Sequence, residues 1–438
     1  MTNQNEGLKR ELGIADVAIN VINIAIASGI FLLPALIAGI LGNASIVAYA
    51  VCGFMFLLVA LCYAEVSSRI TTSGGMYAYI EKAFGPFWGF LANTLFWFGT
   101  GAFVAAALIN GIADMLSIPF PILNQSFYRG LLFLIFFIGV AYSNIIGTKQ
   151  GMLIIKIITV IKILPLILIL VAGLAQLNTA NLSWQGFPSV DKLGAASLIL
   201  FFAFAGGETA LNISGEMKNP NRTAPLGLLL GVLFLVIFYA LLQIVSQSAM
   251  GAELANQKAP LAAVAGILLG SWGIKVLIAC GVIAIFGSFY SIILGFSRVL
   301  FAGAKDGLLP KFLSAVHPKY ATPHLAIISF SVIAFIMAVS GGFRQLIVLA
   351  TITILISYTG VVLVLIKFRL KENTAYPAGF RLPGGLLIPM ITLIILGWFL
   401  FQSKLNELIA IGILLAALSV IYAVKLFFNK RTIINQIN

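Results

Sequence analysis

Long apolar runs separated by short polar segments are the feature that most limits how this chain can fold. About 20 apolar residues suffice for a helix to cross a bilayer, and the chain is 61% hydrophobic and 9% charged, against about 25% charged residues in soluble domains. Because a backbone in lipid must satisfy its hydrogen bonds internally, the sequence predicts an all-α membrane protein. Twelve transmembrane helices are expected, at residues 13–41, 45–67, 86–116, 128–146, 152–177, 193–213, 225–249, 273–302, 324–340, 344–367, 385–403 and 405–428.

The net charge of +13 is distributed unevenly between the two ends of these helices. With the N-terminus placed inside, 19 of the 26 Lys and Arg residues fall on the inner side and six on the outer, and the remaining one is Lys162. Cytoplasmic segments of membrane proteins carry such an excess of positive charge. The pattern predicts a multi-pass protein of the cytoplasmic membrane with both termini in the cytoplasm, and it gives no reason to expect nucleic acid as a partner.

The first span carries residues that weaken a helix at its centre. Gly29 costs about 1 kcal/mol relative to Ala in a helix interior, and Pro34 lacks a backbone donor. Backbone groups freed at membrane depth are tolerated where they face protein, a cavity or a ligand. A break at Ala27-Ser28-Gly29 therefore predicts half of a binding site, although small residues would also suit a close contact between two helices.

Free N–H groups at the start of a half-helix, with the positive end of its dipole, suit an anion. We expect the amides of Ser28, Gly29 and Ile30, helped by the Ser28 hydroxyl, to bind a substrate carboxylate. Carbonyls near four residues would accept hydrogen bonds from a substrate ammonium group: Ile24, Ala25, Phe202 and Ala205.

The sixth span has a similar interruption, with Gly206 and Gly207 followed by the carboxylate of Glu208. In addition, segments 71–89 and 259–273 each read as a short amphipathic helix that ends near a Trp-Gly pair, on opposite sides of the membrane. Interrupted segments at corresponding positions of two halves indicate a transporter built as an inverted repeat.

Four motifs, in order and suitably spaced, resemble the amino acid–polyamine–organocation (APC) superfamily of transporters over essentially the whole chain. They are SGIFLLP at 28–34, SGGMYAY with FGPF within 73–87, FAGGE with EMKNPNRTAP within 204–225, and KDGLLP at 305–310. The spacing and the glutamate are most similar to bacterial arginine/agmatine-type exchangers and related amino acid permeases. The resemblance implies a LeuT-like fold, in which two inverted five-helix repeats and two C-terminal helices hold the substrate between helices 1 and 6, both broken in mid-membrane.

On this scheme the chain divides into five parts. They are a cytoplasmic N-terminal segment (1–12), a first repeat (13–177), a second repeat (193–368), transmembrane helices 11 and 12 (385–428) and a cytoplasmic tail (429–438).

Two ionisable residues are expected deep in the membrane, where such groups are functional by default. Desolvation favours the neutral form of Glu208, which could take and release a proton during transport, and the matching glutamate of the resembling exchangers is implicated in proton sensing or gating. Lys162 is similar in place to a lysine that some proton-coupled members carry instead of a bound sodium. Structural roles are the alternatives: Glu208 would bind freed backbone groups, and Lys162 would pair with a carbonyl or reach water on the inner side.

The prediction is a secondary active transporter, not an enzyme, that moves a neutral and mostly apolar amino acid by alternating access. Ala205, Gly206 and Gly207 leave room for a side chain without offering it a charge, and Phe202 stands where the arginine exchangers carry tryptophan. Proton-coupled uptake is preferred over exchange of amino compounds. A sodium symporter or a non-transport membrane component is less favoured.

No cofactor or metal is expected, because the spans lack the Ser/His, paired-Asp or metal-ligand groupings that an intramembrane enzyme would need. The three cysteines lie in or beside apolar spans without a CxxC pair, which favours buried thiols. The implied partners are the amino acid, protons and the lipid bilayer, with a homodimer as a further option.

Overall fold

The computed structural model describes residues 12–70, 75–146, 151–184, 186–305, 309–371 and 379–437, and the regular secondary structure of these residues is helical. An isolated parallel bridge joins Leu12 to Met217. Side chains at residues 28, 75, 151–161, 212–216 and 424–437 lie outside the description.

The first half of the chain runs from α1 to η4. Its elements are α1 (Ile14–Ala25), α2 (Ser28–Leu41), η1 (Gly42–Ala44), α3 (Ser45–Arg69), α4 (Gly75–Phe84), α5 (Pro86–Leu95), η2 (Phe96–Phe103), α6 (Val104–Leu116), η3 (Pro121–Asn124), α7 (Ser126–Ile146), α8 (Gly151–Ala175) and η4 (Thr179–Leu182).

The second half runs from α9 to α16. Its elements are α9 (Val190–Phe204), η5 (Gly207–Glu216), α10 (Pro220–Met250), η6 (Gly251–Asn256), α11 (Pro260–Leu269), α12 (Ser271–Lys305), η7 (Lys311–Ser314), α13 (His324–Ser340), α14 (Phe343–Leu370), α15 (Leu387–Phe401) and α16 (Leu405–Ile437).

Each of the twelve predicted spans coincides with one or more of these helices. Eight stretches in the described part of the chain are long and apolar enough to cross a bilayer, and five further apolar helices are shorter. The helical membrane architecture is therefore confirmed, and the number of twelve crossings stays a prediction.

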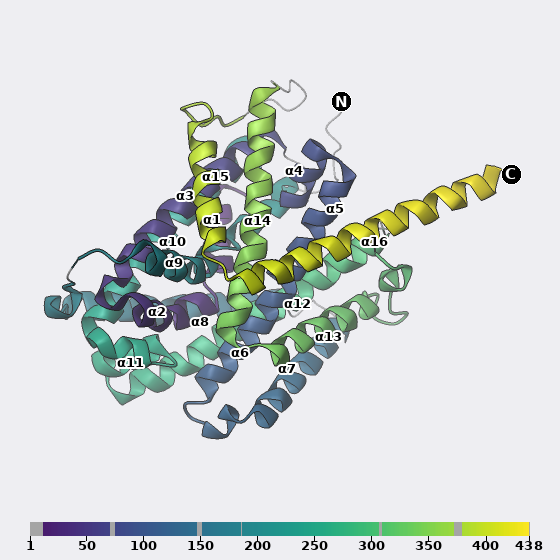
Figure 1. Ribbon diagram of the computed structural model, residues 1–438. Helices are drawn as coiled ribbons and strands as arrows, with labels where there is room; N and C mark the ends of the chain where they lie inside the picture. Colours follow the sequence, from purple (N-terminus) through teal and green to yellow (C-terminus); the bar gives the residue numbers. More distant parts are fainter. Residues whose placement is uncertain are drawn as a thin grey trace.

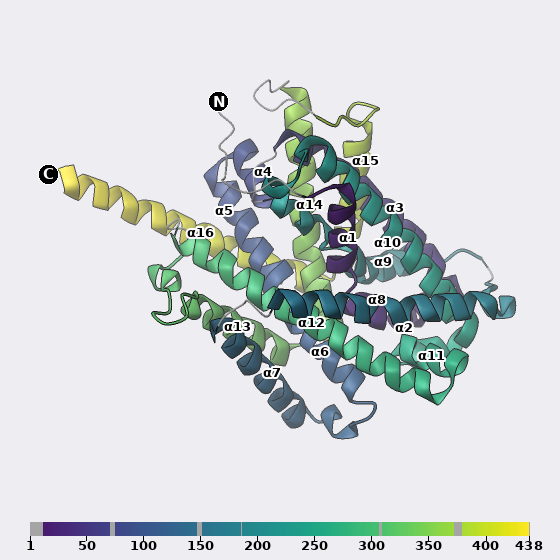
Figure 2. The same ribbon diagram turned by 180° about the vertical axis from the view of Figure 1, so that it is seen from behind.

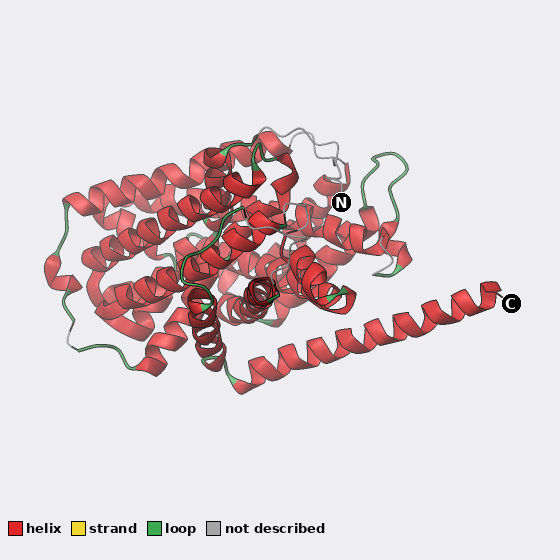
Figure 3. Cartoon of the chain, turned by 90° about the horizontal axis from the view of Figure 1, so that it is seen from above, coloured by secondary structure: helices red, strands yellow, loops and turns green. Residues whose placement is uncertain are grey.

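The helices gather into two packed groups (Figures 1 and 2). In one group α1, α3 and α10 pack together, with α2 and α9 against each other. In the other group α6, α7, α12 and α13 contact one another, while α14 touches members of both groups. The two predicted short helices are present as α4 and α11 and lie at opposite ends of the molecule (Figures 1 and 2). The last helix, α16, extends beyond the other helices (Figure 3).

A buried ionic cluster fixes the end of the molecule near α4. The Glu65 carboxylate on α3 is fully buried and pairs with Arg69 and, from α14, with Arg369. It also accepts a hydrogen bond from the backbone N–H of Leu382 at 2.9 Å. Because removing one partner of a buried ion pair costs about 3–5 kcal/mol, this cluster anchors α3, α14 and the segment before α15 to one another.

Candidate substrate-binding site

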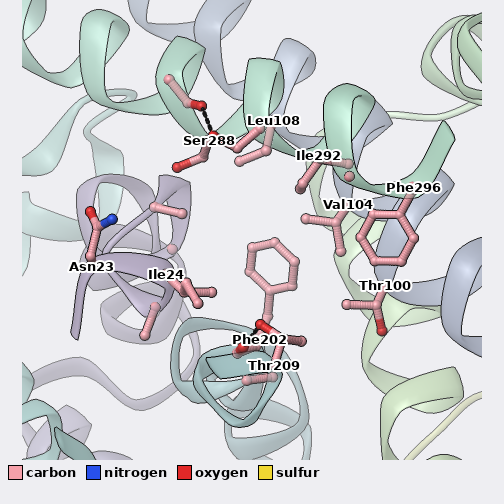
Figure 4. Close-up of a pocket in the computed structure, with 18 of the residues that line it drawn as sticks. Asn23, Ile24, Thr100, Val104, Leu108, Phe202, Thr209, Ser288, Ile292 and Phe296 are labelled. Atoms are coloured by element: carbon pink, nitrogen blue, oxygen red, sulfur yellow. Dashed lines mark hydrogen bonds between the residues drawn. The ribbon is translucent and has the colours of Figure 1, made fainter. Parts of the chain in front are cut away.

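A cavity of about 270 Å³ lies where α1, α2 and α9 come together. Figure 4 shows its walls, with Asn23 and Ile24 on one side and Val104, Thr100 and Phe296 on the other. The lining residues are Asn23, Ile24, Ala25, Ala27, Gly29, Thr100, Val104, Leu108, Lys162, Phe202, Ala205, Gly206, Thr209, Gly287, Ser288, Ser291, Ile292, Gly295, Phe296 and Ile354.

The first wall is a break between two helices, as the sequence predicts. Helix α1 ends at Ala25 and α2 begins at Ser28, so Ile26 and Ala27 are not helical. The carbonyls at the end of α1 are reached by side chains of distant helices: the Lys162 ammonium from α8 donates to the Asn23 carbonyl at 2.5 Å, and the Tyr239 hydroxyl from α10 donates to the Ala25 carbonyl at 3.0 Å.

Lys162 is the one charged side chain among the described lining residues. Its side chain is only 4% exposed, and a buried cation needs a compensating partner. The described partner is a carbonyl in the last turn of α1, where the helix dipole places partial negative charge. The lysine thus places a positive charge beside the backbone carbonyl oxygens at the end of α1.

Gly29 both lines the cavity and allows a close contact between helices. A Cβ at this position would lie 2.8 Å from the Ala203 Cα on α9, so a larger residue would push α2 and α9 apart. The two interpretations of the small residues in the first span are therefore compatible. A substitution of Gly29 would disturb helix packing as well as the cavity.

The second wall is a break after α9. This helix ends at Phe204, and Gly206 has φ of +103°, a left-handed conformation that glycine adopts without strain. The Gly206 N–H donates to the Glu208 carboxylate at 2.9 Å. The Gly206 carbonyl accepts from the Thr209 hydroxyl at 2.6 Å and from the Thr209 N–H at 3.0 Å. The freed backbone groups are thus bound by the next three residues of the same chain.

The Phe202 ring points into the centre of the cavity (Figure 4). It also meets the Phe343 ring of α14 edge-on, with the two centroids 6.3 Å apart. This contact joins the cavity lining to the start of α14.

The wall opposite the breaks comes from η2, α6 and α12. The η2 segment is a π-helix that brings Thr100 to the cavity. On α12, the hydroxyls of Ser288 and Ser291 donate to the carbonyls of Ala284 and Gly287 in their own helix. Each serine can therefore present its lone pairs to a ligand without giving up its own bond.

Glu208 lies beside a second, much smaller cavity of about 10 Å³, which it lines with Tyr63, Tyr79, Phe96 and other residues. The hydroxyls of Tyr63 and Tyr79 are buried, and neither has a hydrogen-bond partner within the described ranges. This volume is about what one water molecule needs. The lining offers the Glu208 carboxylate and two phenols beside the apolar Met76, Phe96 and Leu211.

A family model described as amino acid permease matches residues 12–436, nearly the whole chain. The chain belongs to the amino acid permease family. The predicted membership of the APC superfamily is thereby confirmed.

Individual relatives agree with this assignment. The permease is 30% identical to the serine/threonine exchanger SteT of Bacillus subtilis, over 97% of this chain and 99% of the relative. It is 25% identical to the branched-chain amino acid permease BcaP of the same organism, over 91% and 90% of the two chains. It is 27% identical to the human large neutral amino acids transporter small subunit 2, over 93% and 78%. The protein is thus a multi-pass membrane protein of a transporter family.

The structure brings together most of the residues that the sequence singled out. Eight of them line the cavity of this permease: Ile24, Ala25, Ala27, Gly29, Lys162, Phe202, Ala205 and Gly206. Ile30 is buried but is not among the lining residues, and Glu208 lines the small cavity instead. The Ser28 side chain falls outside the described side chains, and its role stays a prediction.

Part of the far wall of the permease cavity was not predicted from the sequence. Thr100, Val104, Leu108 and Phe296 lie in predicted spans in which apolar residues occur on every face, so periodicity gives no signal for them. A π-helix leaves no sequence signature either. The available signal was the presence of hydroxyl side chains within a span, at Thr100, Ser288 and Ser291. No grouping of three or more His, Cys, Asp or Glu residues suited to a metal occurs in the described part of the chain.

Proposed function

We propose that this permease is a secondary active transporter that binds one neutral amino acid in the cavity between the two helix breaks and moves it by alternating access. The observation that carries the proposal is the meeting of two interrupted helices at one cavity of about 270 Å³. Discontinuous helices at a repeat interface are the usual construction of a transporter site. The volume is below the range of about 300–1,000 Å³ typical of drug-sized ligands, which favours one small molecule.

The backbone of the break supports an amino acid as the ligand. The N-terminus of α2 offers the amides of Ser28, Gly29 and Ile30 to a carboxylate at the positive end of the helix dipole. The ammonium group would bind carbonyls at the C-terminal ends of the two helices before the breaks, near Ile24 and Ala25 of α1 and near Phe202 of α9 and the following Ala205. Since the Ala25 carbonyl already accepts from Tyr239, we place most of the ammonium contacts on the others.

The lining of the cavity favours a neutral side chain on the substrate. The wall opposite the breaks carries the apolar groups Val104, Leu108 and Ile292 beside the hydroxyls of Thr100 and Ser291. Among the described lining residues, no carboxylate would meet a cationic side chain, and Lys162 would repel one. A mostly apolar amino acid therefore fits best, with room for a small hydroxyl.

Two ionisable residues, one at each break, support proton coupling. Lys162 donates to the Asn23 carbonyl of the first break, and loss of its proton would remove the positive charge there. Glu208 binds the Gly206 N–H of the second break, and it faces the small cavity that Tyr63 and Tyr79 share. One water there would connect the carboxylate to two phenol groups and give its proton a route.

The arrangement is proposed to be LeuT-like, with two inverted repeats, both termini in the cytoplasm and the amino acid crossing the cytoplasmic membrane. The short helices α4 and α11 at opposite ends of the molecule support the inverted relation (Figure 1). Exchange of one amino compound for another is the second candidate mode, because the relative SteT is named as an exchanger.

The test is uptake by the purified protein in proteoliposomes. A panel of labelled neutral, acidic and basic amino acids would be offered with a proton gradient, with a sodium gradient, or with unlabelled amino acid inside. Saturable uptake of neutral amino acids driven by the proton gradient is expected. Uptake that requires internal amino acid would select the exchanger, and the absence of any amino acid uptake would reject the proposal.

A further inference from the structure

A third cavity, of about 490 Å³, lies near the start of α14 and is larger than the central cavity between the breaks. We call it the Arg344 cavity. Its lining comes from α2, α6, α7, α13 and α14, and α14 begins at its end farther from α4 (Figure 1). Its lining residues are Leu36, Asn110, Asp114, Ser126, Arg129, Gly130, Phe133, Ala338, Val339, Gly341, Gly342, Phe343 and Arg344.

The Arg344 cavity and the central cavity adjoin each other at one aromatic contact. Phe343 lines the Arg344 cavity and Phe202 lines the central one. The two rings meet edge-on with centroids 6.3 Å apart, so one aromatic pair separates the two spaces.

One side of the Arg344 cavity is held rigidly. Arg129 donates to the Asp114 carboxylate at 2.7 Å and to the Asn110 side-chain oxygen at 2.8 Å. Asn110 in turn donates to the carbonyl of Ala338 at 3.0 Å. These bonds tie α6, α7 and α13 together. Asp114 lines the cavity, and 32% of its side chain is exposed.

The other side carries a cation of a different kind. Arg344 is exposed, and no hydrogen bond or ion pair to it occurs within the described ranges. An unpaired guanidinium presents a planar fork of donors that matches a carboxylate. The lining of the cavity therefore combines an unpaired cation on α14 with the Asp114–Arg129 ion pair of α6 and α7.

We propose that the Arg344 cavity is a second, weaker binding site for the amino acid substrate, in which Arg344 binds the carboxylate and Asp114 accepts the ammonium group. The site receives the zwitterion before the Phe202–Phe343 pair opens. It recognises the carboxylate and ammonium groups that all amino acids share. It therefore raises the affinity for substrate at this end of the protein and does not select among side chains. The inference rests on the proposed transport function.

The test compares uptake kinetics of the Arg344→Gln variant and the wild type in right-side-out and inverted membrane vesicles. Arg344 lies outside the central cavity, so the maximal rate should not change. From the face that carries Arg344, KM is expected to rise by about three- to tenfold, which is the range for loss of a partly screened charge-assisted bond. From the opposite face KM should stay at the wild-type value, and Arg344→Lys should recover part of the loss.

A matched control separates a binding site from general attraction by surface charge. Lys192, near the start of α9, is also exposed and does not line either cavity, and Lys192→Gln should leave KM unchanged at both faces. Three results would each overturn the inference. KM could rise equally in Arg344→Gln and Lys192→Gln, it could rise at both faces in Arg344→Gln, or it could stay unchanged in Arg344→Gln. If the wild type itself showed no saturable amino acid uptake, the proposed function would fail first.

Discussion

The α1–α2 break and the α9–η5 break face the same cavity, but their backbone groups are satisfied in different ways. At the first break, the Asn23 and Ala25 carbonyls accept from Lys162 on α8 and Tyr239 on α10. At the second break, the polar groups of Gly206 bind Glu208 and Thr209, which follow within three residues.

This difference assigns different behaviour to the two breaks. The first is stabilised by contacts between helices, so any movement of α8 or α10 relative to α1 changes it. The Gly206 hydrogen bonds of the second lie within its own segment, although that segment also packs against α1, α4 and α10. We expect the first break to couple transport to helix motion. We expect the second break to keep one conformation, with a net charge set by the protonation of Glu208.

The largest effect is expected from Lys162→Met, which removes the cation at the first break and keeps a side chain of similar length. Transport should fall about 100-fold or more, equivalent to about 3 kcal/mol. The thermal stability of the protein should not decrease, because an apolar group carries no desolvation cost in a buried position. Uptake assays and thermal unfolding of the purified variant measure the two quantities.

Lys275→Met is the matched control for this change, since Lys275 is exposed at the start of α12. It should transport as the wild type does. A Lys162→Met protein with normal, pH-dependent uptake would show that the lysine is only a structural partner of Asn23.

At the second break, Glu208→Gln tests the carboxylate with little change of shape. The amide oxygen can still accept from the Gly206 N–H, so the break should persist and substrate affinity should change by no more than about threefold. The dependence of uptake on pH should disappear, because the amide does not ionise. The measurement is the rate of uptake across acidic to neutral pH. Asp191→Asn at the other end of α9 is the control, and an unchanged pH profile in Glu208→Gln would return this residue to a structural role.

A smaller effect is expected from Tyr239→Phe, which removes one hydroxyl and leaves the ring in place. The lost bond to the Ala25 carbonyl is worth about 1 kcal/mol, so uptake should fall by about fivefold. Because this contact joins α10 to the first break, unfolding temperature should fall with it. If the variant were as active and as stable as the wild type, contacts between helices would not control the first break.

The smallest effect is expected from Thr209→Val at the second break. The Gly206 carbonyl loses the hydroxyl donor but keeps the Thr209 backbone N–H at 3.0 Å. Uptake should change by less than about threefold. A loss larger than that of Tyr239→Phe would reverse the comparison, since the second break would then be the less robust one.

The sequence was sufficient to locate both breaks. It did not show which side chains form hydrogen bonds with the backbone groups that the first break leaves free. Gly29 and Pro34 weaken the first span, yet the interruption lies at Ile26 and Ala27, just before the glycine. The partner Tyr239 lies 214 positions from Ala25, and no local pattern predicts such a contact. The second break was clearer, because Gly206, Gly207 and Glu208 are adjacent and act locally.

The lining of the cavity also has one half that the sequence predicts and one half that it does not. The half formed by the breaks was predictable from helix-weakening residues in spans that should otherwise be uniform. The half formed by Thr100, Val104 and Phe296 depends on how α6 and α12 rotate in the bundle, and on the π-helix η2. In spans that are apolar all round, residue type does not tell which face meets the cavity. The Arg344 cavity, which combines residues of five helices, was likewise not foreseen.

The most direct test of the central claim is equilibrium binding of the transported amino acid to two variants that add the same bulk to the same helix. Ile292→Trp fills part of the cavity between the breaks, whereas Ile283→Trp lies on an exposed position of α12. The account predicts that binding weakens by about 30-fold or more in the first variant and is unchanged in the second. Wild-type affinity in Ile292→Trp would contradict the placement of the substrate in this cavity.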